Sequence, residues 1–98
     1  MHLNLAGQYA EAKTFLRREM PEARRALEPE NQMYLGLRHA YAHALFNTAD
    51  NSMDDRREAV AILEDIHRIS IRVLGPSHPV TRDRQTDVKA ARDLLAGL

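Results

Sequence analysis

Residues 57–81 read REAVAILEDIHRISIRVLGPSHPVT, an apolar and charged run that ends in a Gly-Pro pair and is followed by a His-Pro pair. Apolar residues recur in this run at steps of three and four, which is the spacing of one face of an α-helix. Gly75 can take the left-handed conformation that ends a helix, and Pro76 cannot continue one. The stretch therefore predicts a long helix, a tight turn and the start of another helix.

The same design occurs once earlier, at residues 9–32, which read YAEAKTFLRREMPEARRALEPENQ. One constant offset of 47 residues aligns the two copies, and it pairs identical residues along their length. The identical pairs are Glu11 and Glu58, Ala12 and Ala59, Leu16 and Leu63, Arg25 and Arg72, Leu27 and Leu74, Pro29 and Pro76, and Ala44 and Ala91. A constant spacing of this kind indicates an internal repeat.

The two copies resemble the tetratricopeptide repeat, in the long form found in kinesin light chains. Its opening pattern, Gly-x-Tyr-x-Glu-Ala, is matched by Gly7, Tyr9, Glu11 and Ala12, and its closing pattern, Leu-Gly-Pro-x-His-Pro-x-Thr, by residues 74–81. The first copy keeps only Leu27 and Pro29 of the closing pattern. The resemblance implies an all-α solenoid fragment of about four helices in antiparallel helix-turn-helix repeats. It also implies a non-catalytic scaffold that holds a peptide or a partner helix in a concave groove.

The length of 98 residues predicts a single helical repeat domain. We expect residues 7–32 to be the second half of repeat 1, residues 33–81 to be repeat 2, and residues 82–98 to be a C-terminal capping helix. Residues 48–53 (TADNSM) are polar and turn-forming, and we interpret them as a lengthened loop. Solenoids usually need three or more repeats, so the alternative of a fragment from a longer repeat array stays open.

The expected helices are residues 9–27, 31–47, 54–74 and 80–96. Pro21 lies inside the first of them, and the sequence leaves open whether it bends one helix or divides two. Asn31 is placed to cap the second helix. The resemblance implies a close helix crossing at Ala42, with Ala59 on the paired helix, whereas Lys89, at the matching place in the last helix, would block such a crossing. This last helix is therefore expected to be a polar end cap.

Charge and composition exclude several classes of function. The formal net charge is zero, which argues against general nucleic-acid binding and against an anionic membrane surface. The absence of cysteine excludes disulfides and thiolate metal sites. No apolar run approaches the ~20 residues that span a bilayer, and residues 1–7 lack the pattern of a signal peptide. We therefore expect a cytoplasmic protein without a cofactor.

Four residues of the second expected helix are candidates for the binding groove: Arg38, His39, His43 and Phe46. His39 and His43 are four residues apart, so both rings project from one face of the helix. The resemblance places this face in the peptide groove, where Arg38 would suit an acidic ligand. Surface or packing histidines are an alternative. A zinc or nickel site is ranked last, because the residues between the two histidines offer no ligand.

No catalytic site can be identified in the sequence. The four glycines are isolated, so there is no phosphate-binding loop, and no Gly-x-Ser-x-Gly elbow occurs. Arg17, Arg18, Arg24 and Arg25 form a basic strip, which we interpret as a solvated outer face rather than a patch for an acidic partner. The alternative to a peptide scaffold is self-association, in which an exposed stripe around Phe15 and Tyr41 pairs with a second copy.

Overall fold

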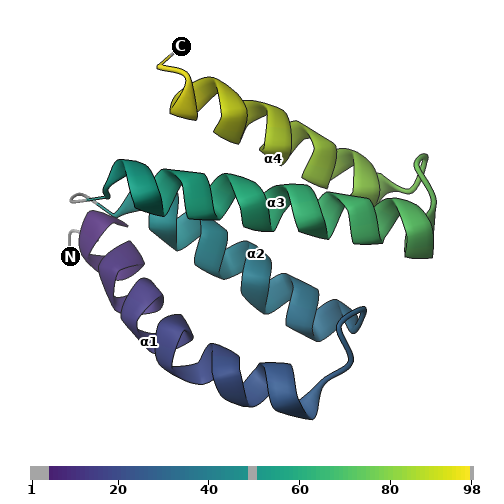
Figure 1. Cartoon of the computed structure of the whole chain (residues 1–98), viewed down its shortest axis with the longest axis horizontal. Coiled ribbons are helices and arrows are strands. Elements are labelled where there is room, and N and C mark those ends of the chain that lie inside the picture. The colour runs from purple at the N-terminus through teal and green to yellow at the C-terminus, as the bar shows by residue number, and fades with distance from the viewer. Residues whose placement is uncertain (1–4, 49–50, 98) are drawn as a thin grey trace.

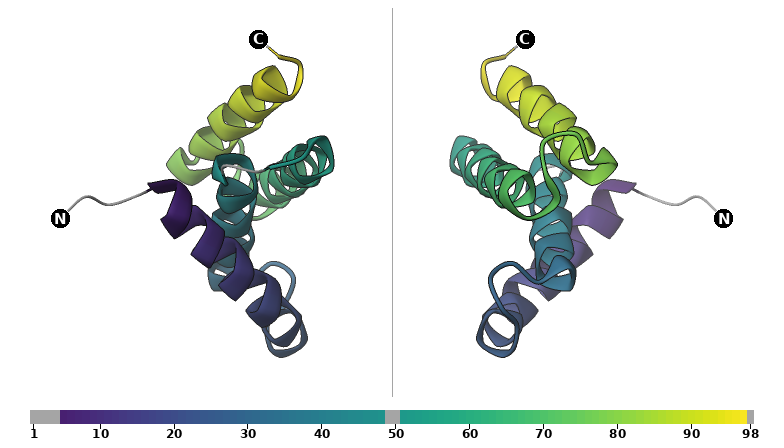
Figure 2. Two further views of the ribbon diagram at one scale, coloured as in Figure 1. Left: turned by 90° about the vertical axis from the view of Figure 1, so that its left-hand side faces the viewer. Right: turned by 90° about the vertical axis from the view of Figure 1, so that its right-hand side faces the viewer.

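The computed structural model describes residues 5–48 and 51–97 of the chain. The described part is all-α, and its helices are α1 (Leu5–Ala26), α2 (Gln32–Asn47), α3 (Met53–Leu74) and α4 (Pro79–Leu95). Each helix packs against its neighbour in sequence, and the short turns make successive helices antiparallel (Figure 1). The end-on views of Figure 2 show α2 between α1 and α3. The expected all-α, repeat-like architecture of four helices is confirmed.

The first helix is continuous through its proline. Pro21 lies inside α1, which begins at Leu5, earlier than expected, and bends along its length (Figure 1). Proline removes one backbone hydrogen bond and its ring clashes with the preceding turn, so a bend at this point is the expected response. The question that the sequence left open is thus decided in favour of one bent helix.

Side-chain caps determine where α2 and α3 begin. The Oδ1 of Asn31 accepts hydrogen bonds from the backbone N–H groups of Met33 and Tyr34, at 2.9 and 3.1 Å, as the sequence predicted. Ser52 caps α3 in a reciprocal arrangement with Asp55 that was not predicted from the sequence. The Asp55 N–H donates to Ser52 Oγ at 3.0 Å, and the Ser52 N–H donates to Asp55 Oδ2 at 3.3 Å. Both arrangements satisfy N–H groups that a helix leaves without partners in its first turn.

The turn between α3 and α4 explains the pattern at residues 74–81. Gly75 has a φ of 91° and a ψ of 155°, which is a region open almost only to glycine and differs from the left-handed helical conformation that we expected. His78 caps α4, because its Nδ1 accepts from the Val80 N–H at 3.1 Å. Thr81 is buried and donates from Oγ1 to the Ser70 carbonyl at 3.3 Å. The pattern thus ends α3, begins α4 and joins the two helices.

The core is made by small residues where helices cross and by aliphatic residues around them. Ala42 of α2 and Ala59 of α3 are both fully buried in the main cluster, as the sequence predicted. The other members of this cluster are Leu16, Tyr41, Leu45, Val60, Leu63, Val88 and Ala91. A second cluster of Leu35, Ile66 and Ile69 lies farther along the α2–α3 boundary. Ile71 and Val73, in the last turn of α3, are apolar but exposed.

The described ends of the lengthened loop are tied to the helices that they join. Thr48 is buried and donates from Oγ1 to the Ala44 carbonyl at 2.6 Å. Asn51 donates from Nδ2 to the Phe46 carbonyl at 2.8 Å, and its Oδ1 accepts from Arg56 Nε at 2.6 Å. Residues 49–50 of this loop lie outside the described part of the chain. Among the described helices, none combines the length and apolarity needed to cross a bilayer.

Candidate functional site

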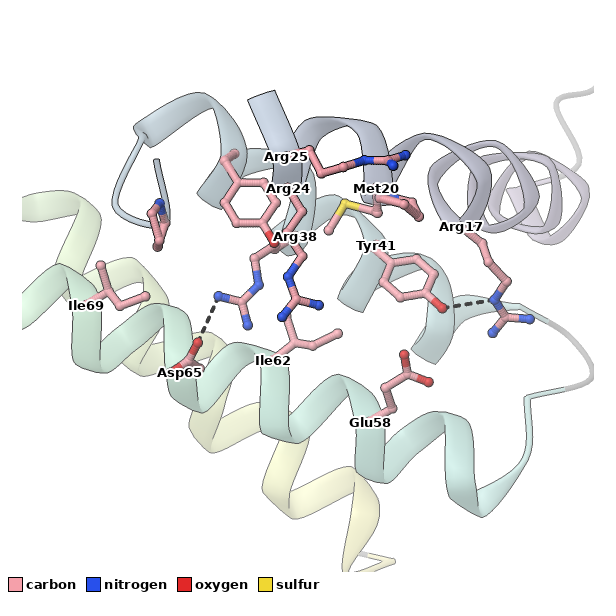
Figure 3. Close-up of a pocket in the computed structure, with 13 residues that line it drawn as sticks. Arg17, Met20, Arg24, Arg25, Arg38, Tyr41, Glu58, Ile62, Asp65 and Ile69 are labelled. Atoms are coloured by element: carbon pink, nitrogen blue, oxygen red, sulfur yellow. Dashed lines mark hydrogen bonds and ion pairs between the residues drawn. The ribbon is translucent and has the colours of Figure 1, made fainter. Parts of the chain in front are cut away.

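A cleft of about 810 Å³ is bounded by α1, α2 and α3 (Figure 3). Near its N-terminus, α1 is tied to α3 by an ion pair between Lys13 and Asp55 at 3.0 Å. Beyond Lys13, no further ion pair joins these two helices in the described part of the chain, and they diverge (Figure 1). The divergence leaves part of α2 uncovered between them. Pro21 of α1 also lines the cleft.

One end of the cleft is organised by Arg17 and Tyr41. Arg17 donates from Nε to the Tyr41 hydroxyl at 3.1 Å, and its guanidinium carbon lies 5.9 Å from the centre of the tyrosine ring (Figure 3). The hydrogen bond to Tyr41 raises the pKa of Arg17 above its ordinary value, with smaller contributions from Glu58 and Asp55. Tyr41 is buried, so the stripe of Phe15 and Tyr41 that the sequence suggested as a dimer contact is not exposed as one surface.

The other end of the cleft is organised by an ion pair across the α2–α3 boundary. Arg38 donates from Nη1 to Asp65 Oδ2 at 2.8 Å (Figure 3), and Arg68 donates to the other carboxylate oxygen at 3.3 Å. Burial acts to raise the pKa of Asp65, but the hydrogen bonds from the two arginines outweigh it and leave the pKa below its ordinary value. Asp65 is therefore ionised at neutral pH and holds Arg38 in place.

The remaining charges make the cleft cationic. Arg24 and Arg25 line it from α1, and Arg24 makes no ion pair with any described residue. Four lining arginines (Arg17, Arg24, Arg25 and Arg38) face two lining carboxylates (Glu58 and Asp65), a formal balance of 4 − 2 = +2. Met20, Ile62 and Ile69 add apolar surface. The cleft thus offers cationic side chains around an apolar floor, in a chain whose net charge is zero.

A second cluster lies between α2 and α4. His39 and Asp87 form a hydrogen bond of 2.7 Å between Nε2 and Oδ2, and the rings of His39 and His43 are 4.5 Å apart at their centres. The Nε2 of His43 is buried and makes no hydrogen bond with any described residue. Burial lowers the pKa of His43 and the neighbouring His39 lowers it further, while Asp87 acts in the opposite direction. His43 is therefore neutral at pH 7.

The structure divides the four residues that the sequence grouped as a groove. Arg38 lines the α1–α2–α3 cleft, whereas His39 and His43 lie against Asp87 of α4. Phe46 is half-buried against the main core cluster and lines a small pocket with His43. Only one member of the predicted group is thus part of the α1–α2–α3 cleft.

Several residues of both sites were missed by sequence reasoning. The spacing of seven between Arg17 and Arg24 placed them on one face of a helix, but nothing in the sequence showed that α3 would stand opposite this face. Asp87 lies 44 residues beyond His43, and no local signal connects the two. Both sites depend on contacts between helices, which the sequence pattern does not specify.

No family model, curated protein or solved structure matches this chain. The resemblance to the tetratricopeptide repeat therefore remains a prediction.

Proposed function

We propose that this chain is a non-catalytic interaction module that holds an acidic peptide segment of a partner protein in the α1–α2–α3 cleft. The observation that carries the proposal is the cleft itself, with four arginines around an apolar floor. We also retain the tetratricopeptide-like identity as a proposal, supported by the four antiparallel helices and by the structural roles of Gly75, His78 and Thr81.

The chemistry of the cleft favours a peptide over a small molecule. The cleft is open rather than enclosed, and its cationic groups are guanidinium groups, which bind carboxylates in bidentate geometry. Met20 and Ile62 are only partly buried, so the apolar side chain of a bound peptide would cover them. A segment with acidic residues around an aromatic or aliphatic anchor matches both features.

Arg24 is the residue on which recognition depends most directly. Arg17 and Arg38 are already held by Tyr41 and Asp65, so their positions are fixed before a ligand binds. Arg24 makes no ion pair with a described residue and points into the cleft in Figure 3. A carboxylate of the ligand would pair with it without breaking an existing contact.

The test begins with selection from a random peptide library displayed on phage, with the whole chain as the target. Library inserts of about twelve residues suffice, because an extended chain covers about 3.3 Å per residue and the longest dimension of the protein is 38 Å. We expect enrichment of sequences with Asp or Glu around an aromatic or aliphatic residue. Failure to enrich any peptide, or enrichment of neutral or basic ones, would overturn the proposal.

Variants then locate the binding site of a selected peptide, measured by fluorescence anisotropy. Arg24→Glu reverses one charge in the cleft and should weaken binding at least about tenfold, since it replaces a charge-assisted hydrogen bond by repulsion. Arg82→Glu is the matched control, because Arg82 is exposed on α4 and does not line the cleft. Equal losses in the two variants would show that only the overall charge matters.

Self-association is retained as a second candidate because of one observation. Phe15 of α1 is 53% exposed, and the guanidinium carbon of Arg18 lies 5.9 Å from the centre of its ring. Sedimentation of the parent and of Phe15→Gln over a range of concentrations tests this candidate. A dimer that forms in the parent and is absent in the variant would support association through this face.

A further inference from the structure

We propose that His39, His43 and Asp87 form a binding site for a zinc ion between α2 and α4. The ligand atoms that these three residues offer all lie within 4.8 Å of one another. Two imidazoles and one carboxylate form a ligand set that zinc accepts, with a water molecule in the fourth position. The site is separate from the arginine-lined cleft, so the inference does not depend on the proposed peptide function.

The geometry requires only small side-chain movements. Zinc lies about 2.0–2.2 Å from nitrogen and oxygen ligands, so tetrahedral coordination places two ligand atoms about 3.3 Å apart. The His39–Asp87 contact of 2.7 Å would therefore open slightly, and the longest separation of 4.8 Å would shorten. His39 and His43 occupy successive turns of α2, which holds both rings on one side of the helix. Rotation about side-chain bonds supplies such changes without moving the backbone.

The strongest single indication is the unpartnered nitrogen of His43. Its Nε2 is buried and accepts or donates no hydrogen bond in the described part of the chain. Buried polar atoms are almost always paired, because an unpaired one carries a desolvation penalty. A metal ion shared with the neighbouring His39 and Asp87 would provide the missing partner.

A purely structural role explains only part of the cluster. The hydrogen bond between His39 and Asp87 would by itself tie α2 to α4. It gives no reason for a second histidine whose ring lies 4.5 Å away and whose nitrogen is unsatisfied. The two interpretations therefore differ in what they require of His43.

The cluster is open to solvent. The Asp87 carboxylate also makes no ion pair with a cation of α4 in the described part of the chain. An opening of about 480 Å³ is lined by His39 and Asp87, and a smaller one of about 120 Å³ by His43 and Asp87. Arg84, one turn before Asp87, donates instead to Ser70 Oγ at 2.7 Å. An ion can thus reach the three ligands from solvent, and Asp87 keeps an oxygen for it.

The experiment is a calorimetric titration of the untagged, metal-free protein with zinc sulfate, together with melting curves in excess zinc and in excess chelator. We expect one ion per chain and a melting temperature higher in zinc than in chelator. Cobalt, added in place of zinc, should give the visible absorption of a four-coordinate ion. Absence of binding at 100 times the protein concentration, or a stoichiometry unrelated to one site, would overturn the proposal.

His43→Leu separates the metal site from a structural contact. Leucine is apolar and of similar size, and it removes both ring nitrogens, including the buried and unpartnered Nε2, so the metal-free variant should melt no lower than the parent. Its zinc affinity should fall at least about 100-fold. Loss of a residue that only hydrogen-bonds to a metal ligand weakens metal binding by about 100-fold at most, so a larger loss would indicate that His43 is itself a ligand. Asp87→Asn should also weaken binding, while His67→Leu, a histidine of α3 outside the cluster, should leave it unchanged.

The possible results have separate meanings. Zinc affinity that is equal in the parent and in His43→Leu would overturn the site. A metal-free His43→Leu that melts well below the parent would show instead that the nitrogen has a structural role. Arg24→Glu should leave zinc binding unchanged, so that failure of the zinc site and failure of the peptide cleft can be told apart.

Discussion

Arg84 of α4 donates from Nη1 to the hydroxyl oxygen of Ser70 in α3, at 2.7 Å, and both side chains are buried. The Ser70 hydroxyl in turn donates to the Ile66 carbonyl at 2.8 Å. Burial lowers the pKa of Arg84, and the charge of Asp87 partly offsets this effect. A guanidinium that is nearly excluded from solvent depends on such an acceptor, so this contact joins the polar half of α4 to the core.

Ser70→Ala should therefore destabilise the protein by about 1–3 kcal/mol, because it leaves a buried guanidinium donor without an acceptor. Denaturant unfolding monitored by circular dichroism measures the change. Ser77→Ala is the control, since Ser77 is exposed in the turn and should have little effect. Similar stabilities of the two variants would mean that Arg84 finds another partner.

Ala59→Leu should destabilise the protein by about 1–3 kcal/mol, because the added carbons overpack the crossing of α2 and α3. Ala59 and Ala42 are both fully buried in one cluster. Ala61→Leu makes the same chemical change at an exposed position of the same helix. Melting curves should show a lower midpoint for the first variant only, and an unchanged midpoint would contradict the close crossing.

The ion pair of Lys13 and Asp55 should make stability depend on pH in the acidic range. The hydrogen bond from Lys13 lowers the pKa of Asp55 below its ordinary value of 3.8, and the Ser52 N–H adds to this effect, although burial opposes it. Because the folded-state pKa is the lower one, the stabilisation is fully present above the unfolded-state value and is lost as the pH falls through the folded-state value.

Asp55→Asn should therefore reduce the loss of stability between pH 5 and pH 2, by an amount on the order of 0.5–1 kcal/mol. Unfolding in denaturant at a series of pH values measures it. Asp54→Asn is the control, because the Asp54 side chain is 94% exposed. If both variants followed the pH dependence of the parent, the ion pair would make no contribution to stability.

Two glycine substitutions should have opposite effects. Gly75→Ala should cost about 1–3 kcal/mol, because alanine is strained at a φ of 91° and a ψ of 155°. Gly36→Ala should stabilise by about 0.5–1 kcal/mol, because Gly36 lies within α2 and a methyl group there would meet nothing within 4 Å. Melting curves of the two variants and of the parent test both predictions. If both variants melted above the parent, or both below it, one of the two predictions would be wrong.

The fold was largely predictable because its signals are local. Apolar spacing indicated four helices, Asn31 indicated the start of α2, and Gly75 indicated the end of α3. The reciprocal cap of Ser52 and Asp55 is also local, but Ser52 lies among several polar residues that could each begin a helix. Errors in helix bounds were confined to a few residues at the ends, where the number of backbone hydrogen bonds is smallest.

The sites were predictable only in part, because their members come from different helices. The sequence correctly placed His39 and His43 on one face of α2, since four residues are about one helical turn. It grouped Arg38 with them, although a step of one residue turns the side chain by about 100° around the helix axis. Arg38 therefore points toward α3 and Asp65, while His39 points toward α4 and Asp87.

The sequence by itself determined that this chain is helical and where its helices turn. These features follow from backbone preferences and from the period of the apolar residues, which act within a few positions. Only the tertiary structure decided that α1 diverges from α3 and opens an arginine-lined cleft, and that Asp87 meets two histidines of α2. Those outcomes depend on the angles at which helices pack, and packing angles are set by the fit of whole surfaces rather than by any local run of residues.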